Sequence, residues 1–302
     1  MKKIYIFLFN ILIILLLFFL LDFFVYSSKA NYITYFQNLT KKIAVSPSDD
    51  KRYLENFYIE QMRKPRNINS NLGSIIVVGC SFVYGSGLNE DETITYKISE
   101  LLDNPVYNFG FISKAINTFI TFIEVGLLEE IVKTPPKIVI YNYGDFHIQR
   151  LVMPNLFYED NEFLYYIKNY KLERKRPPFF VSRSIVLSLI REKIFLFFQS
   201  NSLKYREYLK LLLKMHFLEM KKIIDSKYKD VKYIIIVYFD APIFEEISQD
   251  LEKEGFVILR NREGDLGVDV SDETYQLPDG HPSAKAWETV VPHLVNTLKL
   301  YL

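Results

Sequence analysis

Cysteine and glycine are both scarce in this chain of 302 residues, and neither sign of charge dominates. Cys80 is the only cysteine, so an intramolecular disulfide is excluded and the fold must be stabilised by its hydrophobic core. The 37 Lys and Arg residues balance 36 Asp and Glu residues, and this near neutrality argues against nucleic acid as a partner. With only 11 glycines in the chain, each glycine cluster is informative.

One glycine cluster directly follows a short apolar segment. Residues 75–78 are β-branched and uncharged, which predicts a strand buried on both faces of a parallel sheet. Residues 79–87 contain three glycines and predict a turn, and Ser81 lies where the strand ends. Open α/β sheets bind ligands at the carboxyl edge of their strands. Ser81 is therefore the first candidate functional residue.

The common glycine-containing motifs do not fit this turn. A phosphate loop requires a lysine, and none follows Gly85 or Gly87, while the dinucleotide fingerprint G-x-G-x-x-G is also missing. The nucleophile elbow of α/β hydrolases requires G-x-S-x-G, and Val83 occupies the second glycine position. No group of His, Cys, Asp and Glu has zinc-ligand spacing. Neither a metal nor any other cofactor is expected.

A long apolar segment opens the chain. Residues 4–21 are almost uninterrupted by polar side chains, so residues 1–26 predict an uncleaved transmembrane helix. Lys2 and Lys3 precede this helix, which favours an orientation with the remaining chain in the periplasm or outside the cell. Residues 27–71 are polar and mixed, and they predict a stalk next to the membrane.

Beyond this stalk, strand patterns alternate with helix patterns. The alternation predicts one α/β domain over residues 72–302, with three α/β/α layers around a mostly parallel sheet. Residues 153–229 predict a mainly helical insertion that begins with a hairpin at 156–166. The predicted strands are 75–78, 105–109, 137–143, 233–239 and 255–259, and the predicted helices are 90–102, 114–132, 182–229, 244–253 and a last one with Pro282 in its first turn.

Two further candidates, Asp279 and His281, lie just before this last helix. A serine is a weak nucleophile at its own pKa, so a histidine must take its proton and a carboxylate must hold that histidine in the right tautomer. Each residue alone is commonly a turn or surface residue, but Ser81, Asp279 and His281 together favour a nucleophilic serine site. Cys80, beside the serine, is interpreted as a small buried hydrophobic residue.

Three short segments resemble the conserved blocks of the SGNH hydrolases, also called GDSL-like lipases and esterases. Residues 79–82 (Gly-Cys-Ser-Phe) are similar to the first block, and residues 108–110 (Asn-Phe-Gly) are similar to the second. Residues 279–282 (Asp-Gly-His-Pro) resemble the last block. The resemblance covers about residues 74–302 and implies the flavodoxin-like α/β/α fold of that family.

The resemblance also implies a role for each candidate residue. Ser81 is expected to be the nucleophile, His281 the general base and Asp279 the acid that orients the histidine. The backbone N–H groups of Ser81 and Gly110 are expected to donate to the oxyanion of the reaction.

The third block departs from the family pattern. The family has G-x-N-D, whose asparagine completes the oxyanion hole, whereas here Gly144 is followed by residues 145–147 (Asp-Phe-His). Asn142 lies before the glycine, and on an alternating strand its side chain need not face the serine. His147 begins a polar cluster that ends at Arg150. Asn142 or His147 is therefore the candidate third donor.

The sequence thus predicts a serine-dependent esterase or O-acyltransferase. Its expected partner is an ester substrate, in particular an acetylated glycan or lipid of the cell envelope, and the membrane would hold its N-terminal helix. Hydrolase and transferase share the first half-reaction, so these residues leave the acceptor open, and they leave the oligomeric state open as well. The alternative function is a non-catalytic protein of the same fold that binds glycan or serves as a scaffold.

Overall fold

The computed structural model describes residues 51, 62–112, 114–152, 164–168, 171–175, 203–239, 241–260, 262, 265–267 and 272–302. The predicted membrane helix at 1–26 and most of the predicted stalk lie outside these residues. Within the described part of the chain, no helix combines the length and the apolar character needed to cross a bilayer. The membrane anchor therefore stays a prediction.

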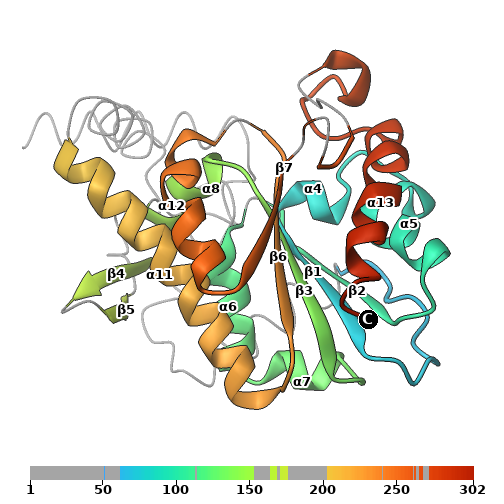
Figure 1. The fold of residues 1–302 in the computed structure, drawn as a ribbon, viewed down its shortest axis with the longest axis horizontal. Coiled ribbons are helices and arrows are strands. Elements are labelled where there is room, and N and C mark those ends of the chain that lie inside the picture. Colours follow the sequence, from blue (N-terminus) through green and yellow to red (C-terminus); the bar gives the residue numbers. More distant parts are fainter. Residues whose placement is uncertain are drawn as a thin grey trace, which may run out of the picture.

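A parallel sheet of five strands forms the centre of the domain (Figure 1). The strands are β1 (Ser74–Gly79), β2 (Val106–Gly110), β3 (Pro136–Tyr143), β6 (Lys232–Val237) and β7 (Phe256–Arg260). Their order is β2-β1-β3-β6-β7, a doubly wound arrangement in which the winding direction reverses between β1 and β3. All five predicted strands are confirmed, and ligands in such sheets bind near the reversal point.

Helices cover both faces of the sheet (Figure 1). Because side chains alternate along a strand, Ile75 and Val77 of β1 enter one core, and Ile76 and Val78 enter the other. The first core contains α4 (Ser81–Tyr84), α5 (Ile94–Leu101) and α13 (Ala284–Leu298), and the second contains α6 (Ile116–Glu124), α7 (Leu127–Ile131), α8 (Phe146–Val152), α11 (Leu203–Lys227) and α12 (Pro242–Lys253).

The helix predicted at 114–132 is two helices. Gly126 separates α6 from α7 and has φ +81°, a left-handed conformation that interrupts a helix and that glycine adopts without strain. The helix predicted at 90–102 likewise begins as a short 3₁₀ helix, η2 (Glu90–Glu92), before α5. These breaks are local and leave the layers unchanged.

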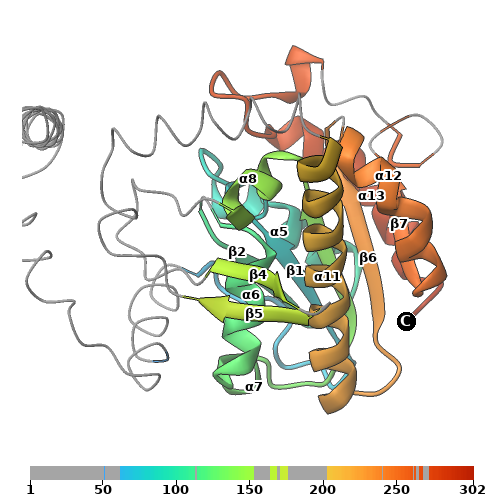
Figure 2. The same ribbon diagram turned by 90° about the vertical axis from the view of Figure 1, so that its left-hand side faces the viewer.

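Most of the hairpin predicted at 156–166 lies outside the described residues. Its last residues, 164–166, belong to a hairpin of β4 (Leu164–Lys168) and β5 (Lys171–Lys175), which pair in antiparallel register beside α11 (Figure 2). The basic composition of β5 concealed this strand. Charged residues are nevertheless compatible with an antiparallel sheet that has a face open to solvent.

Two segments assigned to peripheral regions contact the main domain. Helix α11, from the predicted insertion, buries Leu212, Phe217 and other side chains in the core against α6 and α12. Arg66, from the predicted stalk, exchanges two backbone hydrogen bonds of 3.0 Å with Val106 of β2. The packed domain therefore includes part of both segments.

His216 of α11 is completely buried in this core. Its Nδ1 donates to the carbonyl oxygen of Leu212 at 2.7 Å. Burial penalises the charged imidazolium and lowers the pKa of His216 to about 4. The folded state thus binds a proton at this site less readily than the unfolded chain does.

We expect this histidine to make folding stability fall as pH falls from about 6.5 towards 4, because the unfolded chain then binds the extra proton. At pH 5.5 the loss from His216 is about 1–2 kcal/mol relative to pH 7.5. Urea unfolding of the wild type and His216→Leu at both pH values measures it. The variant should lose this part of the pH dependence, and equal pH dependences in the two proteins would contradict the prediction.

Candidate active site

Ser81 lies at the point where β1 ends and the one-turn helix α4 begins. Cys80 occupies the N-cap position, and Gly85 ends the helix with φ +79°, a conformation suited to glycine. The backbone N–H groups of Gly85 and Ser86 both donate to the carbonyl oxygen of Ser81. The serine is therefore presented by a short, closed turn at the carboxyl edge of the sheet.

The neighbouring strand β2 fixes this turn from one side. The side-chain amide of Asn108 donates to the carbonyl oxygen of Val83 at 2.8 Å and to Thr95 Oγ1 at 3.0 Å. At Gly110, an added Cβ would lie 2.1 Å from the backbone nitrogen of Tyr84. The second glycine-containing segment is thus needed because β2 approaches the backbone of α4 too closely for a side chain.

Arg63 fixes the other end of the same turn. Its guanidinium donates to the carbonyl oxygens of Tyr84, Gly85 and Leu88, each at 3.0 Å. It also forms an ion pair of 3.2 Å with Glu90. These bonds satisfy carbonyl groups that the short helix leaves without partners. Arg63 therefore positions the loop that carries Ser81 without approaching the serine itself.

His281 is held in a tight loop between η3 (Glu273–Tyr275) and α13. The N–H of Leu277 donates to the carbonyl oxygen of His281 at 2.7 Å, and the loop turns at Gly280, which has φ +82°. Pro282, predicted in the first turn of α13, lies before the N-cap residue Ser283. Its bridge to Gln276 closes the loop instead.

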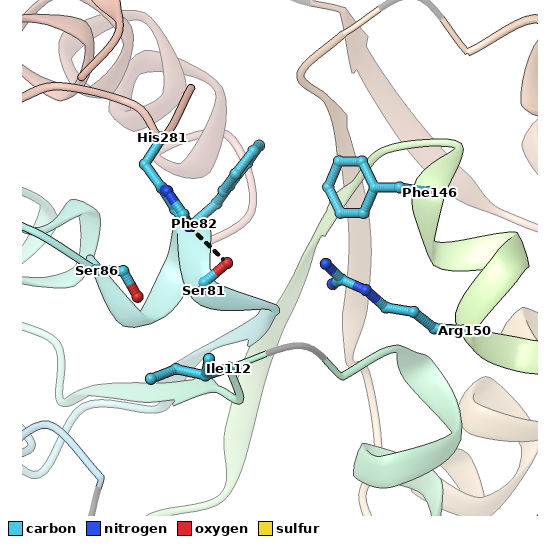
Figure 3. A pocket seen from close by; sticks show the side chains of 7 residues that line it. All are labelled: Ser81, Phe82, Ser86, Ile112, Phe146, Arg150 and His281. Atoms are coloured by element: carbon cyan, nitrogen blue, oxygen red, sulfur yellow. Dashed lines mark hydrogen bonds between the residues drawn. The ribbon is translucent and has the colours of Figure 1, made fainter. Parts of the chain in front are cut away.

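The structure brings Ser81 and His281 into direct contact (Figure 3). The Nε2 atom of His281 lies 2.9 Å from Ser81 Oγ, which is hydrogen-bond distance. The ring of His281 also packs edge-on against Phe82, with centroids 5.3 Å apart. The imidazole is thus oriented by ring packing as well as by its polar contact.

Asp279 lies on the opposite side of the imidazole. Its Oδ2 is 3.0 Å from Nδ1 of His281, and its Oδ1 accepts the backbone N–H of His281 at 3.2 Å. The Nδ1 contact is close but poorly aligned for a hydrogen bond. The backbone N–H of His281 lowers the pKa of Asp279, so the carboxylate is charged at neutral pH. Because 63% of its side chain is exposed, solvent screens its interaction with the imidazole.

A pocket of about 370 Å³ opens beside these residues (Figure 3). Three apolar side chains line it, and Arg150 of α8 extends its guanidinium into it from the side opposite Ser81. The complete lining is Ser81, Phe82, Ser86, Ile112, Phe146, Arg150 and His281. The pocket thus joins a serine, a histidine, an apolar surface and one cation.

The groups expected to donate to an oxyanion do not all face this pocket. The N–H of Gly110 donates to Asn108 Oδ1 at 2.9 Å, so this amide is already committed within β2. Asn142 is completely buried, and it shares the α5/α13 face of β3 with Ile138 and Ile140. Neither residue lines the pocket.

His147, the other candidate donor, is buried among aromatic rings on the opposite face of the sheet. Its Nδ1 lies 3.1 Å from the hydroxyl of Tyr141, and its ring contacts Tyr143 and Phe146. Burial holds the pKa of His147 well below its usual value, so it is neutral. The structure therefore places His147 away from the pocket that contains Ser81.

Cys80 is completely buried in the α5/α13 core and does not line the pocket. This position fits the interpretation of Cys80 as a small hydrophobic residue. In the described ranges, no group of three or more His, Cys, Asp and Glu side chains is placed to hold a metal ion.

Three residues of the site had little or no signal in the sequence. Arg150 belonged to a recognised polar cluster, but only the direction of α8 brings its side chain to the pocket. Asn108 had a signal only as part of the second block, although its amide joins β2 to α4. Arg63 lay in a segment predicted to be a stalk, and no local pattern indicated its contacts.

No family model matches this chain, and no curated protein matches it. Solved structures do resemble it. A lipolytic protein of the G-D-S-L family from Veillonella parvula is 10% identical with a TM-score of 0.46, over 76% of this chain and 99% of that one. The esterase EstA from Pseudoalteromonas sp. is 12% identical with a TM-score of 0.44, over 76% of this chain and 98% of that one.

A family two carbohydrate esterase from Clostridium thermocellum, solved in complex with cellohexaose, is also similar. It is 9% identical with a TM-score of 0.42, over 76% of this chain and 64% of that one. At such identities and TM-scores, the likeness carries no conclusion about chemistry, which has to come from the residues of the site.

Replacing Gly110 should disturb the serine turn directly. In Gly110→Ala, the new Cβ meets the rigid backbone of α4, so we expect a loss of about 1–3 kcal/mol in unfolding free energy. Gly73→Ala is the matched control, because there the Cβ meets the flexible side chain of Lys137. Urea unfolding measures both variants. A Gly110→Ala protein as stable as the control would show that the close approach is unimportant.

Proposed function

We propose that this chain is an SGNH-type serine esterase or O-acyltransferase. The observation that carries the proposal is the 2.9 Å contact between Ser81 Oγ and His281 Nε2, beside an open pocket and next to a charged carboxylate. A serine activated by a histidine performs nucleophilic acyl transfer. Ser81 is the proposed nucleophile, His281 the general base and Asp279 the orienting acid.

In the first half-reaction, Ser81 Oγ attacks the carbonyl carbon of an ester bound in the pocket. His281 Nε2 takes the serine proton as the new C–O bond forms, and the carbonyl electron pair moves onto oxygen. When this intermediate collapses, the alcohol leaves with the proton from His281. Ser81 then carries the acyl group.

In the second half-reaction, His281 removes a proton from the acceptor, which attacks the acyl carbon. As this second intermediate collapses, the bond between the acyl carbon and Ser81 Oγ breaks, and His281 returns the proton to the serine. Water as the acceptor gives a hydrolase, and a sugar hydroxyl gives a transferase. Ser81 is the first residue of α4, so its backbone N–H has no acceptor within that helix. This N–H is a proposed donor to the oxyanion.

The pocket favours a short acyl group on a larger alcohol. Phe82, Ile112 and Phe146 supply apolar contacts next to the nucleophile, and the pocket is open to solvent, which leaves room for a larger alcohol. We propose an acetyl ester of a cell-envelope glycan or lipid as the substrate class. The helix predicted at residues 1–26 would hold the domain at the membrane, in the periplasm or outside the cell.

The decisive experiment compares the wild type with Ser81→Ala in acetate release from acetylated glycan and from 4-nitrophenyl acetate. Loss of the nucleophile should lower kcat by at least ~10⁴-fold, and labelling by a fluorophosphonate should disappear. Ser226→Ala is the control, since its hydroxyl only bonds within α11. Equal acetate release by wild type and Ser81→Ala would refute the serine mechanism. A wild type that neither releases acetate nor labels would support the scaffold alternative.

Asp279→Asn should have a smaller effect than removing the serine. A buried aspartate of a serine protease contributes about 10⁴-fold in kcat, whereas Asp279 is exposed and poorly aligned. We therefore expect a decrease of about 10- to 100-fold. Steady-state kinetics on 4-nitrophenyl acetate measure it, and a decrease as large as that of Ser81→Ala would contradict this weaker role.

A further inference from the structure

Arg150 is a half-buried cation that faces the candidate nucleophile. It lies in the second turn of α8, and its guanidinium points into the pocket from the side opposite Ser81 (Figure 3). No other lysine or arginine lines this pocket. A substrate carbonyl bound between Ser81 and Phe146 would therefore meet this guanidinium.

Two contacts hold the guanidinium in place. Its Nη1 donates to the carbonyl oxygen of Lys114 at 3.0 Å, and its central carbon lies 4.7 Å from the ring centroid of Phe146. Lys114 follows β2, whereas Arg150 and Phe146 follow β3. The side chain thus joins α8, after β3, to the segment after β2, the two strands on either side of β1, and its remaining N–H groups have a fixed direction.

The charge of Arg150 has no carboxylate partner among the residues that the structure describes. The other five arginines with described side chains all have one. These pairs are Arg63 and Arg66 with Glu90, Arg206 with Glu246, Arg260 with Glu245, and Arg262 with Asp265. A half-buried cation is stabilised by an anion, so the pocket is suited to a negative charge that arrives with the substrate or forms on it.

We infer that Arg150 is the charged donor to the oxyanion, in a role that neither Asn142 nor His147 is placed to fill. The inference rests on the proposed function. As Ser81 Oγ bonds to the carbonyl carbon, the carbonyl electron pair moves to oxygen, where an N–H of Arg150 donates to it. The electron pair re-forms the C=O bond when the C–O bond to the leaving alcohol breaks. Arg150 keeps its protons throughout, and only His281 transfers one.

The alternatives for this donor are limited. The N–H of Gly110 is committed to Asn108, and His147 is buried on the other face of the sheet. The hydroxyl of Ser86 also lines the pocket, but it is neutral, so the guanidinium of Arg150 is the charged donor there. A fixed donor of this kind acts in the transition state, so its loss lowers kcat rather than raising KM.

The test measures kcat and KM on 4-nitrophenyl acetate, a neutral ester. Arg150→Met keeps an apolar stem against Phe146 and should lower kcat by about 10²- to 10³-fold, with KM changed less than about 3-fold. Arg150→Lys keeps the charge without the planar guanidinium and should recover part of this loss. Arg206→Gln, at a surface ion pair, is the matched control. The rate of fluorophosphonate labelling should fall with kcat.

Thermal unfolding shows whether each variant is folded. If Arg150→Met does not fold, Arg150→Gln provides the same kinetic test, because it also removes the guanidinium and its charge while keeping a polar side chain. A folded variant whose kcat on the neutral ester stays within about 3-fold of wild type overturns the inference. An increase in KM for 4-nitrophenyl hydrogen succinate with no change in kcat also overturns the inference, because it would assign Arg150 to binding a carboxylate of the substrate. Failure of Ser81→Ala to lower the activity would instead refute the proposed function itself.

Discussion

One hydrogen bond joins two residues that are 200 positions apart, and the rest of the domain holds them together. Ser81 follows the central strand β1, and His281 precedes α13, which packs on one face of the same sheet. Trp287, near the start of α13, is buried against Tyr238 with ring centroids 5.4 Å apart. Any movement of α13 over the sheet would therefore change the distance between Ser81 Oγ and the imidazole.

The serine turn is fixed more firmly than the acid beyond the histidine. Arg63 and Asn108 satisfy four carbonyl groups around α4, and Gly110 brings β2 against its backbone. Asp279, in contrast, is exposed and contacts His281 at a poor angle. Preorganisation is thus concentrated where a reacting carbonyl would lie, which is where a small displacement has the largest effect on rate.

The sequence predicted the layers well because each strand is an apolar segment bounded by turns, as in β1. It also indicated Ser81, Asp279 and His281 as candidates, and the structure places them in contact, although only the sheet order explains why these distant segments meet. Details that depend on contacts in three dimensions could not be predicted from local sequence patterns. The amide of Gly110 is taken by a side chain two residues earlier, and the charged strand β5 lacks an apolar signal. The direction of Arg150 depends on the angle at which α8 leaves β3, which no spacing reveals.

Phe82 belongs to two parts of the site at once. Its ring contacts Phe146, across the pocket, and also the imidazole of His281. A smaller residue here would enlarge the pocket and, at the same moment, remove the support of the base. In the enzyme that we propose, a change of acyl-chain length at this position would therefore also affect the rate, whereas Ile112 lines the pocket from the segment after β2. Substitutions at Ile112 would therefore change the range of substrates with less effect on His281 than substitutions at Phe82.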